Sequence, residues 1–235
     1  MKGRINSIET MGLVDGPGIR FVAFLQGCHL RCKYCHNPET WNKDDKVSKM
    51  TAEELVQKIC KYKNYYGEDG GVTFSGGEPL LQPEFLLKCL KLCKEKNINT
   101  AIDTAGVGFG DYKEILKYVD LVILDVKAVD ETEYKELTGQ PVKYFQEFLN
   151  QVQESGNKIW LRQVIVPGIN DDEKHVLKLK TFANKLKNVE KIELLPYKTI
   201  GVVKYKKLNL PYRLEGVEEM DEEKCKKLEK LLRKK

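Results

Sequence analysis

The chain lacks any long apolar run. No stretch approaches the roughly 18 consecutive apolar residues that a membrane-spanning helix needs. The amino-terminal hexapeptide MKGRIN also lacks the apolar core and cleavage site of a secretory leader. We therefore expect a cytoplasmic protein with no membrane partner.

Internal repeats, low-complexity segments and a recognisable linker are also missing, which predicts a single domain over residues 1–235. Hydrophobic residues make up 41% of the chain and charged residues 32%, enough for a core and against global disorder. The net charge of +5 is small and the lysines are spread along the chain. This pattern favours solvated helix faces, so we expect no nucleic-acid partner. We also expect a monomer.

Disulfide bonds are not expected, although the chain has seven cysteines. In a cytoplasmic protein, cysteines are more often reduced, metal-bound or buried. Cys89 and Cys93 share the spacing of an apolar helix face and are predicted to lie in the core. Cys28, Cys32 and Cys35 differ, because all three fall in one short loop after the apolar run 19–25.

A fourth cysteine is missing from this loop, and the next one along the chain is Cys60, on a predicted helix. A zinc site normally has four ligands, which His29 or His36 would have to complete. A four-iron cluster held by three thiolates instead leaves one iron open to bind a substrate or cofactor. The cysteines alone thus leave a zinc-stabilised binding module and a catalytic iron–sulfur site as alternatives.

Alternating strands and helices indicate the fold. Helices are predicted from a capping box at Thr51, from Pro83, near 111–118, and on the apolar faces 145–152, 176–186 and 217–232. Such alternation predicts a parallel sheet. Six units favour an open or partial barrel over a doubly wound sheet, although periodicity alone does not separate the two. The predicted strands are 19–25, 71–74, 98–102, 121–124, 159–166 and 191–195.

Polar and glycine-rich residues follow the predicted strands, where α/β folds place their active sites. Two of them, Asp103 and Asp125, end consecutive strands, and converging carboxylates repel unless a cation lies between them. Lys127 points to the same face as Asp125 and can supply that charge. A structural ion pair at a strand end is the alternative. The full set is the cysteine loop, the turn 75–79, Asp103, Asp125, Lys127, Arg162 and Tyr197.

The cysteine spacing, with Tyr34 before the last cysteine, resembles the radical S-adenosylmethionine (radical SAM) enzymes. Further motifs resemble the activases of glycyl radical enzymes, in order along nearly the whole chain. The resemblance implies a partial (β/α)6 barrel with parallel strands and outer helices. It also implies a 4Fe–4S cluster on Cys28, Cys32 and Cys35, with S-adenosylmethionine on the fourth iron. The matching segments are 14–21, 26–28, 34–38, 40–41, 75–78, 124–127, 166–168 and 192–197.

The resemblance also implies roles for individual residues. Tyr34 and His36 would contact the adenine side of S-adenosylmethionine, Gly76 and Gly77 its amino group, and Lys127 its carboxylate. A monovalent cation would be held by Asp103, Thr104, Asp125 and the carbonyl of Ile123. Lys198 departs from the family, which usually has a ribose-contacting histidine there, so this role is not assigned to it.

The implied activity is that of an oxidoreductase. One electron from reduced flavodoxin or ferredoxin would cleave S-adenosylmethionine to methionine and a 5′-deoxyadenosyl radical. The radical would take a hydrogen atom from one glycine of pyruvate formate-lyase (formate acetyltransferase), whose loop Asp15 and Arg162 would grip. The alternative is a radical enzyme for a small molecule or another glycyl radical protein. Residues 37–74 contain only Cys60 and so lack the ferredoxin-like insert of several other activases, which favours pyruvate formate-lyase.

Overall fold

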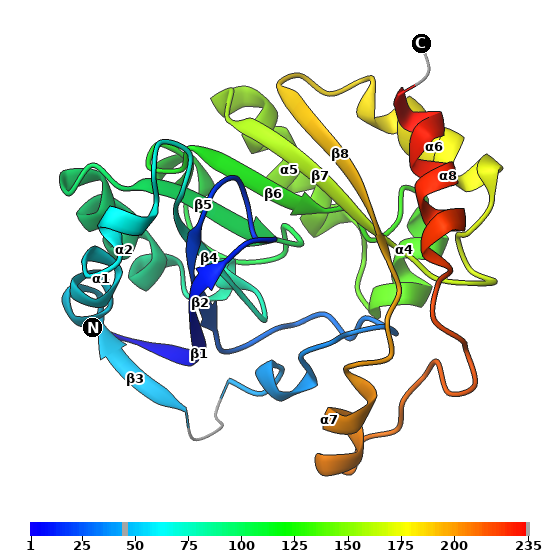
Figure 1. Cartoon of the computed structure of the whole chain (residues 1–235), viewed down its shortest axis with the longest axis horizontal. Coiled ribbons are helices and arrows are strands. Elements are labelled where there is room, and N and C mark those ends of the chain that lie inside the picture. The colour runs from blue at the N-terminus through cyan, green and yellow to red at the C-terminus, as the bar shows by residue number, and fades with distance from the viewer. Residues whose placement is uncertain (44–46, 234–235) are drawn as a thin grey trace.

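One sheet forms the centre of the computed structural model, which describes residues 1–43 and 47–233 (Figure 1). Its strands have the order β3-β1-β2-β4-β5-β6-β7-β8, and from β2 onwards neighbours are parallel and follow chain order. The bounds are β1 Lys2–Gly12, β2 Arg20–Leu25, β3 Ser48–Thr51, β4 Gly71–Gly76, β5 Asn99–Thr104, β6 Leu121–Asp125, β7 Lys158–Ile165 and β8 Val189–Pro196.

All six predicted parallel strands form, which confirms the parallel sheet. The prediction was incomplete at the amino-terminal edge, where β1 pairs antiparallel with β2 and β3. β1 alternates between more and less exposed residues, a weaker signal than the apolar run of β2. β1 ends before the Gly16-Pro17-Gly18 turn, and these turn residues were the clearest local signal in this part of the sequence.

Helices cover the outer face of the sheet (Figure 1). The predicted Thr51 capping box is confirmed, whereas α4 and α7 were not predicted and the last helix begins at Glu222, later than expected. Helices pack in the pairs α1–α2, α2–α3 and α3–α5, and α8 lies on α6 and β8. The helices are α1 Ala52–Cys60, α2 Pro83–Glu95, α3 Tyr112–Leu116, α4 Glu131–Thr138, α5 Lys143–Ser155, α6 Glu173–Ala183, α7 Val202–Lys207 and α8 Glu222–Arg233, with 3-10 turns η1 Pro38–Thr40, η2 Lys63–Tyr65 and η3 Pro79–Leu81.

The two faces of the sheet differ in chemistry because successive strand residues point to opposite sides. The outward residues, such as Phe74, Ile102 and Leu124, join the large core under the helices, as do the predicted Cys89 and Cys93. The inner face holds a small apolar cluster of Ala101, Leu121 and Ile123, with Trp160 against it. Towards the carboxyl ends of the strands, polar side chains share the inner face with Phe24, Val164 and Leu195.

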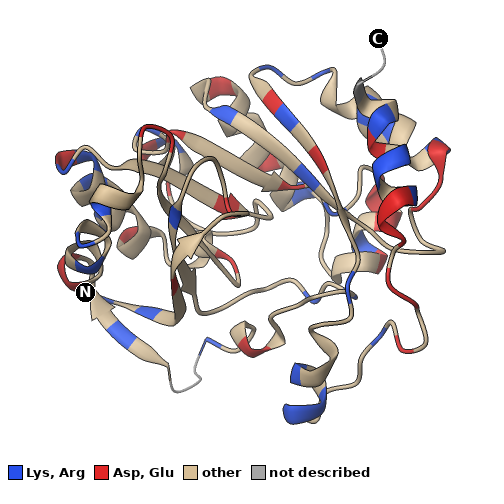
Figure 2. Cartoon of the chain, viewed as in Figure 1, with Lys and Arg blue, Asp and Glu red and all other residues tan. Residues whose placement is uncertain are grey.

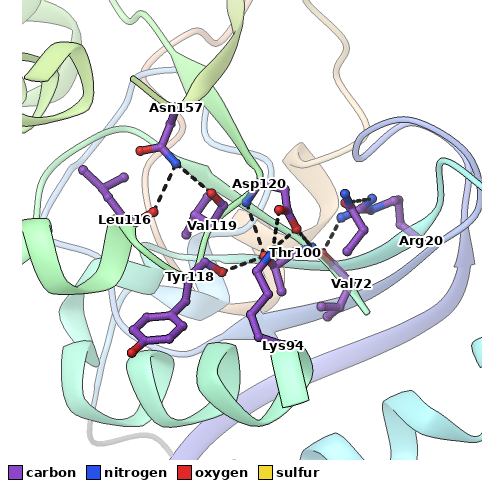
Figure 3. A network of polar contacts seen from close by, with 10 residues as sticks. Arg20, Val72, Lys94, Thr100, Leu116, Tyr118, Val119, Asp120 and Asn157 are labelled. Carbon is purple, nitrogen blue, oxygen red and sulfur yellow. Dashed lines mark hydrogen bonds and ion pairs between the residues drawn. The ribbon is translucent and has the colours of Figure 1, made fainter. Parts of the chain in front are cut away.

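A polar network closes the amino-terminal end of the sheet (Figure 3). Arg20 is fully buried and donates to the Thr73 hydroxyl at 3.0 Å and to the Asn99 side-chain oxygen at 2.8 Å. Asp120, paired with Lys94, accepts from the backbone N–H of Thr100 at 2.9 Å. The charges of Arg20 and Asp120 are thus satisfied where the parallel strands begin, at the end of the sheet opposite to the cysteine loop.

The cysteine loop follows β2 and runs across the open side of the sheet towards α4 (Figure 1). Its backbone is fixed at its start and in its middle: Gly27 N–H donates to the Thr40 carbonyl at 2.7 Å, and Arg31 N–H to the Thr138 carbonyl at 2.8 Å. Basic and acidic residues are interspersed over the outer helices (Figure 2). No helix within residues 1–43 and 47–233 has both the length and the apolarity to cross a membrane.

Candidate active site

A cavity of about 280 Å³ lies between the cysteine loop and the carboxyl ends of the strands. It brings together nearly every residue that the sequence predicted for the site; Arg162 does not line it. Residues far apart in sequence converge because parallel strands all end at the same edge of the sheet. Predicted residues lining the cavity are Asp15, Cys28, Cys32, Tyr34, Cys35, His36, Gly76, Gly77, Asp103, Thr104, Asp125 and Lys127.

The three cysteines are free thiols, with Cys32 buried and Cys28 and Cys35 partly buried. Burial raises the pKa of all three, that of Cys32 to about 12, because a thiolate is poorly solvated there. Ligand binding at these sulfurs must therefore release protons. Among the described residues, no three His, Cys, Asp or Glu side chains are arranged to hold a single metal ion.

A row of charged groups crosses the inner face at the strand ends. Ser75 donates to Asp103 at 2.9 Å, and Lys127 forms a hydrogen-bonded ion pair with Asp125. Lys127 also lies over the ring of Tyr34, 5.4 Å from its centroid. Two buried polar atoms that line this region, Oδ1 of Asp125 and the hydroxyl of Tyr34, have no partner in the structure. Such atoms are sites for a polar ligand or an ordered water molecule, since an unpaired buried group is costly.

Opposing electrostatic effects set the charge state of this row. Burial lowers the pKa of Lys127, but Asp125, Tyr34 and Cys32 together outweigh burial and raise that pKa well above its usual value. Burial raises the pKa of Asp103, while Arg162 lowers it and Asp125 raises it further. Lys127 is therefore protonated and faces the cavity, beside the carboxyl groups of Asp103 and Asp125.

The glycine turn after β4 supports the cysteine loop directly. Gly76 has φ of +120°, and a Cβ there would lie 2.2 Å from the backbone nitrogen of Leu25. A Cβ on Gly77 would lie 2.3 Å from the carbonyl oxygen of Gly27, immediately before Cys28. Glycine is required at both positions because the turn packs against the backbone at the end of β2.

Glu78, which the sequence did not single out for a role, is fully buried behind this turn. Its Oε1 accepts from the Thr104 hydroxyl at 2.5 Å and from Leu80 N–H at 3.1 Å, and its Oε2 from Ala105 N–H at 2.9 Å. The Thr104 hydroxyl also accepts from Gly106 N–H at 2.9 Å. The expected cation ligand Thr104 thus has its hydroxyl engaged with Glu78 on the side away from Asp103.

Asp15 and Arg162, the two candidates for gripping a partner, occupy different positions. Asp15 lines the cavity, and its pKa is raised to about 6 by burial and by the charge of Asp103. Arg162 is buried, donates to Oε2 of Glu193 at 2.9 Å and also donates to the carbonyl of Val14. Arg162 therefore holds the loop that presents Asp15.

The side chain of Lys198 points away from the cavity and pairs with Glu222 at 2.8 Å. Its carbonyl oxygen lies 2.9 Å from Nε2 of His36. The helix α7, which follows it, carries Tyr205 against the cysteine loop, where its ring meets that of Trp41 beside Cys35. The sequence did not predict this contact, because six helical residues carry too weak a periodic signal.

Comparison with known proteins shows which family the chain belongs to. Residues 22–179 match the Radical SAM superfamily model. The chain is 58% identical over 232 residues to the pyruvate formate-lyase-activating enzyme of Clostridium pasteurianum, covering 98% of this chain and 97% of that protein. It is 44% identical over 231 residues to the enzyme of the same name from Staphylococcus epidermidis, covering 95% and 92%.

Two solved structures share the fold. A domain of the pyruvate-formate lyase-activating enzyme from Bacteroides vulgatus has a TM-score of 0.56 and 28% identity, over 70% of this chain and 93% of that chain. A radical SAM methyltransferase from Sphaerobacter thermophilus has a TM-score of 0.63 at 16% identity, over 91% and 63%. This chain belongs to the radical SAM superfamily and, within it, to the family of the pyruvate formate-lyase-activating enzymes.

Proposed function

We propose that this chain is a glycyl radical enzyme activase whose protein substrate is pyruvate formate-lyase. Relatives named for that activity align over nearly their whole length with this chain. The observation that carries the proposal is the convergence of the three thiols with Asp103, Asp125 and Lys127 around one cavity.

The residues present fit the cofactors of this family, a 4Fe–4S cluster and S-adenosylmethionine. Cys28, Cys32 and Cys35 supply thiolate ligands and no fourth cysteine lines the cavity, which matches a cluster with one open iron. When bound, the cluster and S-adenosylmethionine together supply a 5′-deoxyadenosyl radical, which removes a hydrogen atom from a glycine of the partner. The unpartnered Tyr34 hydroxyl and Asp125 oxygen offer polar contacts to a bound cofactor.

The chain's own groups bind and orient the cofactor. Lys127, held as a cation by Asp125, is placed to pair with a carboxylate, while the backbone at Gly76 and Gly77 offers polar groups to an amino acid. Asp103 and Asp125, with the carbonyl of Ile123, are the proposed ligands of a monovalent cation. Tyr34 and His36 form the proposed adenine-side wall.

Asp15 is the proposed contact to the glycine loop of the partner, because it lines the cavity on the turn held by Arg162. Reduced flavodoxin or ferredoxin is the proposed electron donor. We also propose a monomeric, cytoplasmic protein with one domain over residues 1–235; the continuous eight-stranded sheet supports the single domain.

Electron paramagnetic resonance tests the proposal. Anaerobically prepared protein is incubated with pyruvate formate-lyase, S-adenosylmethionine and dithionite, and a glycyl doublet is expected. Cys35→Ala should abolish the doublet, whereas Cys93→Ser, a core cysteine outside the cavity, should retain it. Cleavage of S-adenosylmethionine without a doublet would instead indicate a different substrate, and a zinc protein free of iron would exclude radical chemistry.

A further inference from the structure

The short helix α7 separates Cys35 from solvent on one side of the cysteine loop. Tyr205 is only 3% exposed and lies beside Cys35. Trp41 also lies beside Cys35, and the rings of Trp41 and Tyr205 meet edge to face with centroids 5.7 Å apart. An aromatic layer one residue thick therefore joins the innermost face of α7 to a predicted cluster ligand.

The helix α7 carries basic residues (Figure 2), and exposed apolar residues lie beside them. Val203 is 58% exposed and Ile200, just before the helix, is 71% exposed. Lys206 and Lys207 are exposed, and neither forms an ion pair with any residue that the structure describes. We call Ile200, Val203, Lys206 and Lys207 the α7 face.

The α7 face is held in a fixed position relative to Cys35. Lys204 points inward from the same helix and donates to Oδ1 of Asn37 at 2.8 Å and to Oε1 of Glu39 at 2.5 Å. Gly201 packs so closely on the loop that a Cβ there would lie 2.9 Å from Cα of His36. A partner bound to this face would therefore stand at a defined distance from the cysteines.

We propose that the α7 face docks an acidic one-electron carrier protein, whose electron enters past Tyr205 and Trp41 at the Cys35 side of the site. This inference rests on the proposed function. The carrier is oxidised by one electron, the protein-bound cluster is reduced by one electron, and no atom is transferred. Opposite charge steers such short-lived complexes, and their interfaces are small, as this face is.

The position of the face favours this occupant over the protein substrate. No residue of α7 lines the cavity, where the substrate glycine has to react. Asp15, the proposed substrate contact, belongs to the β1–β2 connection. Two exposed lysines on a six-residue helix also form a smaller basic surface than nucleic acids usually engage.

The double variant Lys206→Glu/Lys207→Glu tests the proposal in the cluster-containing enzyme. Lys185→Glu/Lys187→Glu is the charge-matched control: it lies before β8, at the opposite end of the strand from α7, and both lysines are exposed. Reduced flavodoxin, an acidic carrier, is the probe. We measure the affinity of flavodoxin for the enzyme without S-adenosylmethionine. We also measure the rate of cluster reduction, seen as bleaching, at low and high salt. Dithionite serves as a protein-free reductant for comparison.

Weaker flavodoxin binding and a reduction rate lower by about tenfold or more at low salt are expected for the α7 variant only. High salt should narrow its difference from wild type, because screening removes the steering. Unchanged binding and rate would overturn the proposal. Slower reduction by dithionite would also overturn the proposal, because it would show damage at the site. Normal reduction with a lost glycyl doublet would overturn it as well, because it would assign the face to the protein substrate. A wild-type doublet with dithionite tests the proposed function separately.

Discussion

Glu78 is the residue that connects the glycine turn to the end of β5. Its carboxylate accepts from the Thr104 hydroxyl and from the backbone N–H groups of Leu80 and Ala105, all inside the core. The sequence motif led us to expect a turn whose glycines let the backbone approach a ligand. The structure adds that the adjacent carboxylate fixes the position of Thr104 and hence of the loop beside Asp103.

Substitution Glu78→Gln should destabilise the fold although the side chain keeps its shape. A glutamine amide has only one accepting oxygen, so its NH2 group would face either Ala105 N–H or the donors on the other side. We expect a loss of about 2–3 kcal/mol in the free energy of unfolding, measured with urea. Glu84→Gln, at an exposed position on α2, is the control and should change little. Equal stability of the two variants would contradict this role.

His175 gives the protein a pH-dependent stability. Its Nε2 lies 3.0 Å from the buried Gln163 oxygen, and burial lowers its pKa below the ordinary 6.5, although Glu133 and Asp172 oppose this. The unfolded chain therefore binds more protons than the folded one as pH falls below about 6.5, so the unfolding free energy contributed here declines.

His175→Gln removes the titrating ring and keeps a donor for Gln163. Urea unfolding at several pH values below neutrality should show a shallower decline than in the wild type. The chain has only three histidines, and His29 is exposed, so His29→Gln is a suitable control. Parallel pH profiles for wild type and His175→Gln would refute the assignment.

At the scale of elements, α7 acts as a cover for the cysteine loop. It is anchored by Lys204 to η1 and by close packing of Gly201 on His36 and on the carbonyl of Cys35. A six-residue helix has little intrinsic stability. Its structure therefore depends on these tertiary contacts, which explains why the periodicity of the sequence did not reveal it.

Gly201→Ala should separate α7 from the cysteine loop. The added Cβ would lie 2.9 Å from Cα of His36 and 3.2 Å from the carbonyl of Cys35, both backbone atoms that cannot turn aside. We expect a lower iron content and faster bleaching in air, followed by visible absorbance. Val203→Ala, on the exposed side of the same helix, should retain its iron as the wild type does. Equal bleaching rates would show that α7 does not shield the site.

Across the whole molecule, Arg162 connects the two sides of the open sheet. It donates to the Val14 carbonyl in the β1–β2 connection and to Glu193 on β8. In the sheet, Arg162 on β7 lies opposite Asp125 of β6 on one side and Glu193 of β8 on the other. One buried side chain thus fixes the loop that carries Asp15 to the far half of the sheet.

Arg162→Gln should release the β1–β2 connection without unfolding the protein. Glu193 keeps Lys191 as a partner at 2.8 Å, so no isolated charge is left there. Hydrogen exchange at residues 13–18 should become faster, while exchange in the β5 and β6 core stays unchanged. Activation of the partner should then require higher partner concentrations, because Asp15 is less well placed. Slow exchange at 13–18 in this variant would contradict the bridging role.

Local patterns in the sequence sufficed for the six parallel strands, the capping box at Thr51 and the cysteine motif, because apolar runs, caps and ligand spacing are short-range features. They also placed Asp103, Asp125 and Lys127 at strand ends, and the pairing of Lys127 with Asp125 follows from a separation of two residues. Resemblance along the chain indicated the family, which the comparisons confirm.

Only the tertiary structure decided what depends on contacts between distant segments. The antiparallel pairing of β1 and β3, the burial of Glu78 against Thr104, the bond from Arg162 to Val14 and the packing of α7 on Cys35 all join residues far apart in sequence. Lys198 is an example: the sequence left its role unassigned, and the structure shows that its side chain pairs with Glu222. Side-chain direction at such positions follows from packing geometry, which no local pattern encodes.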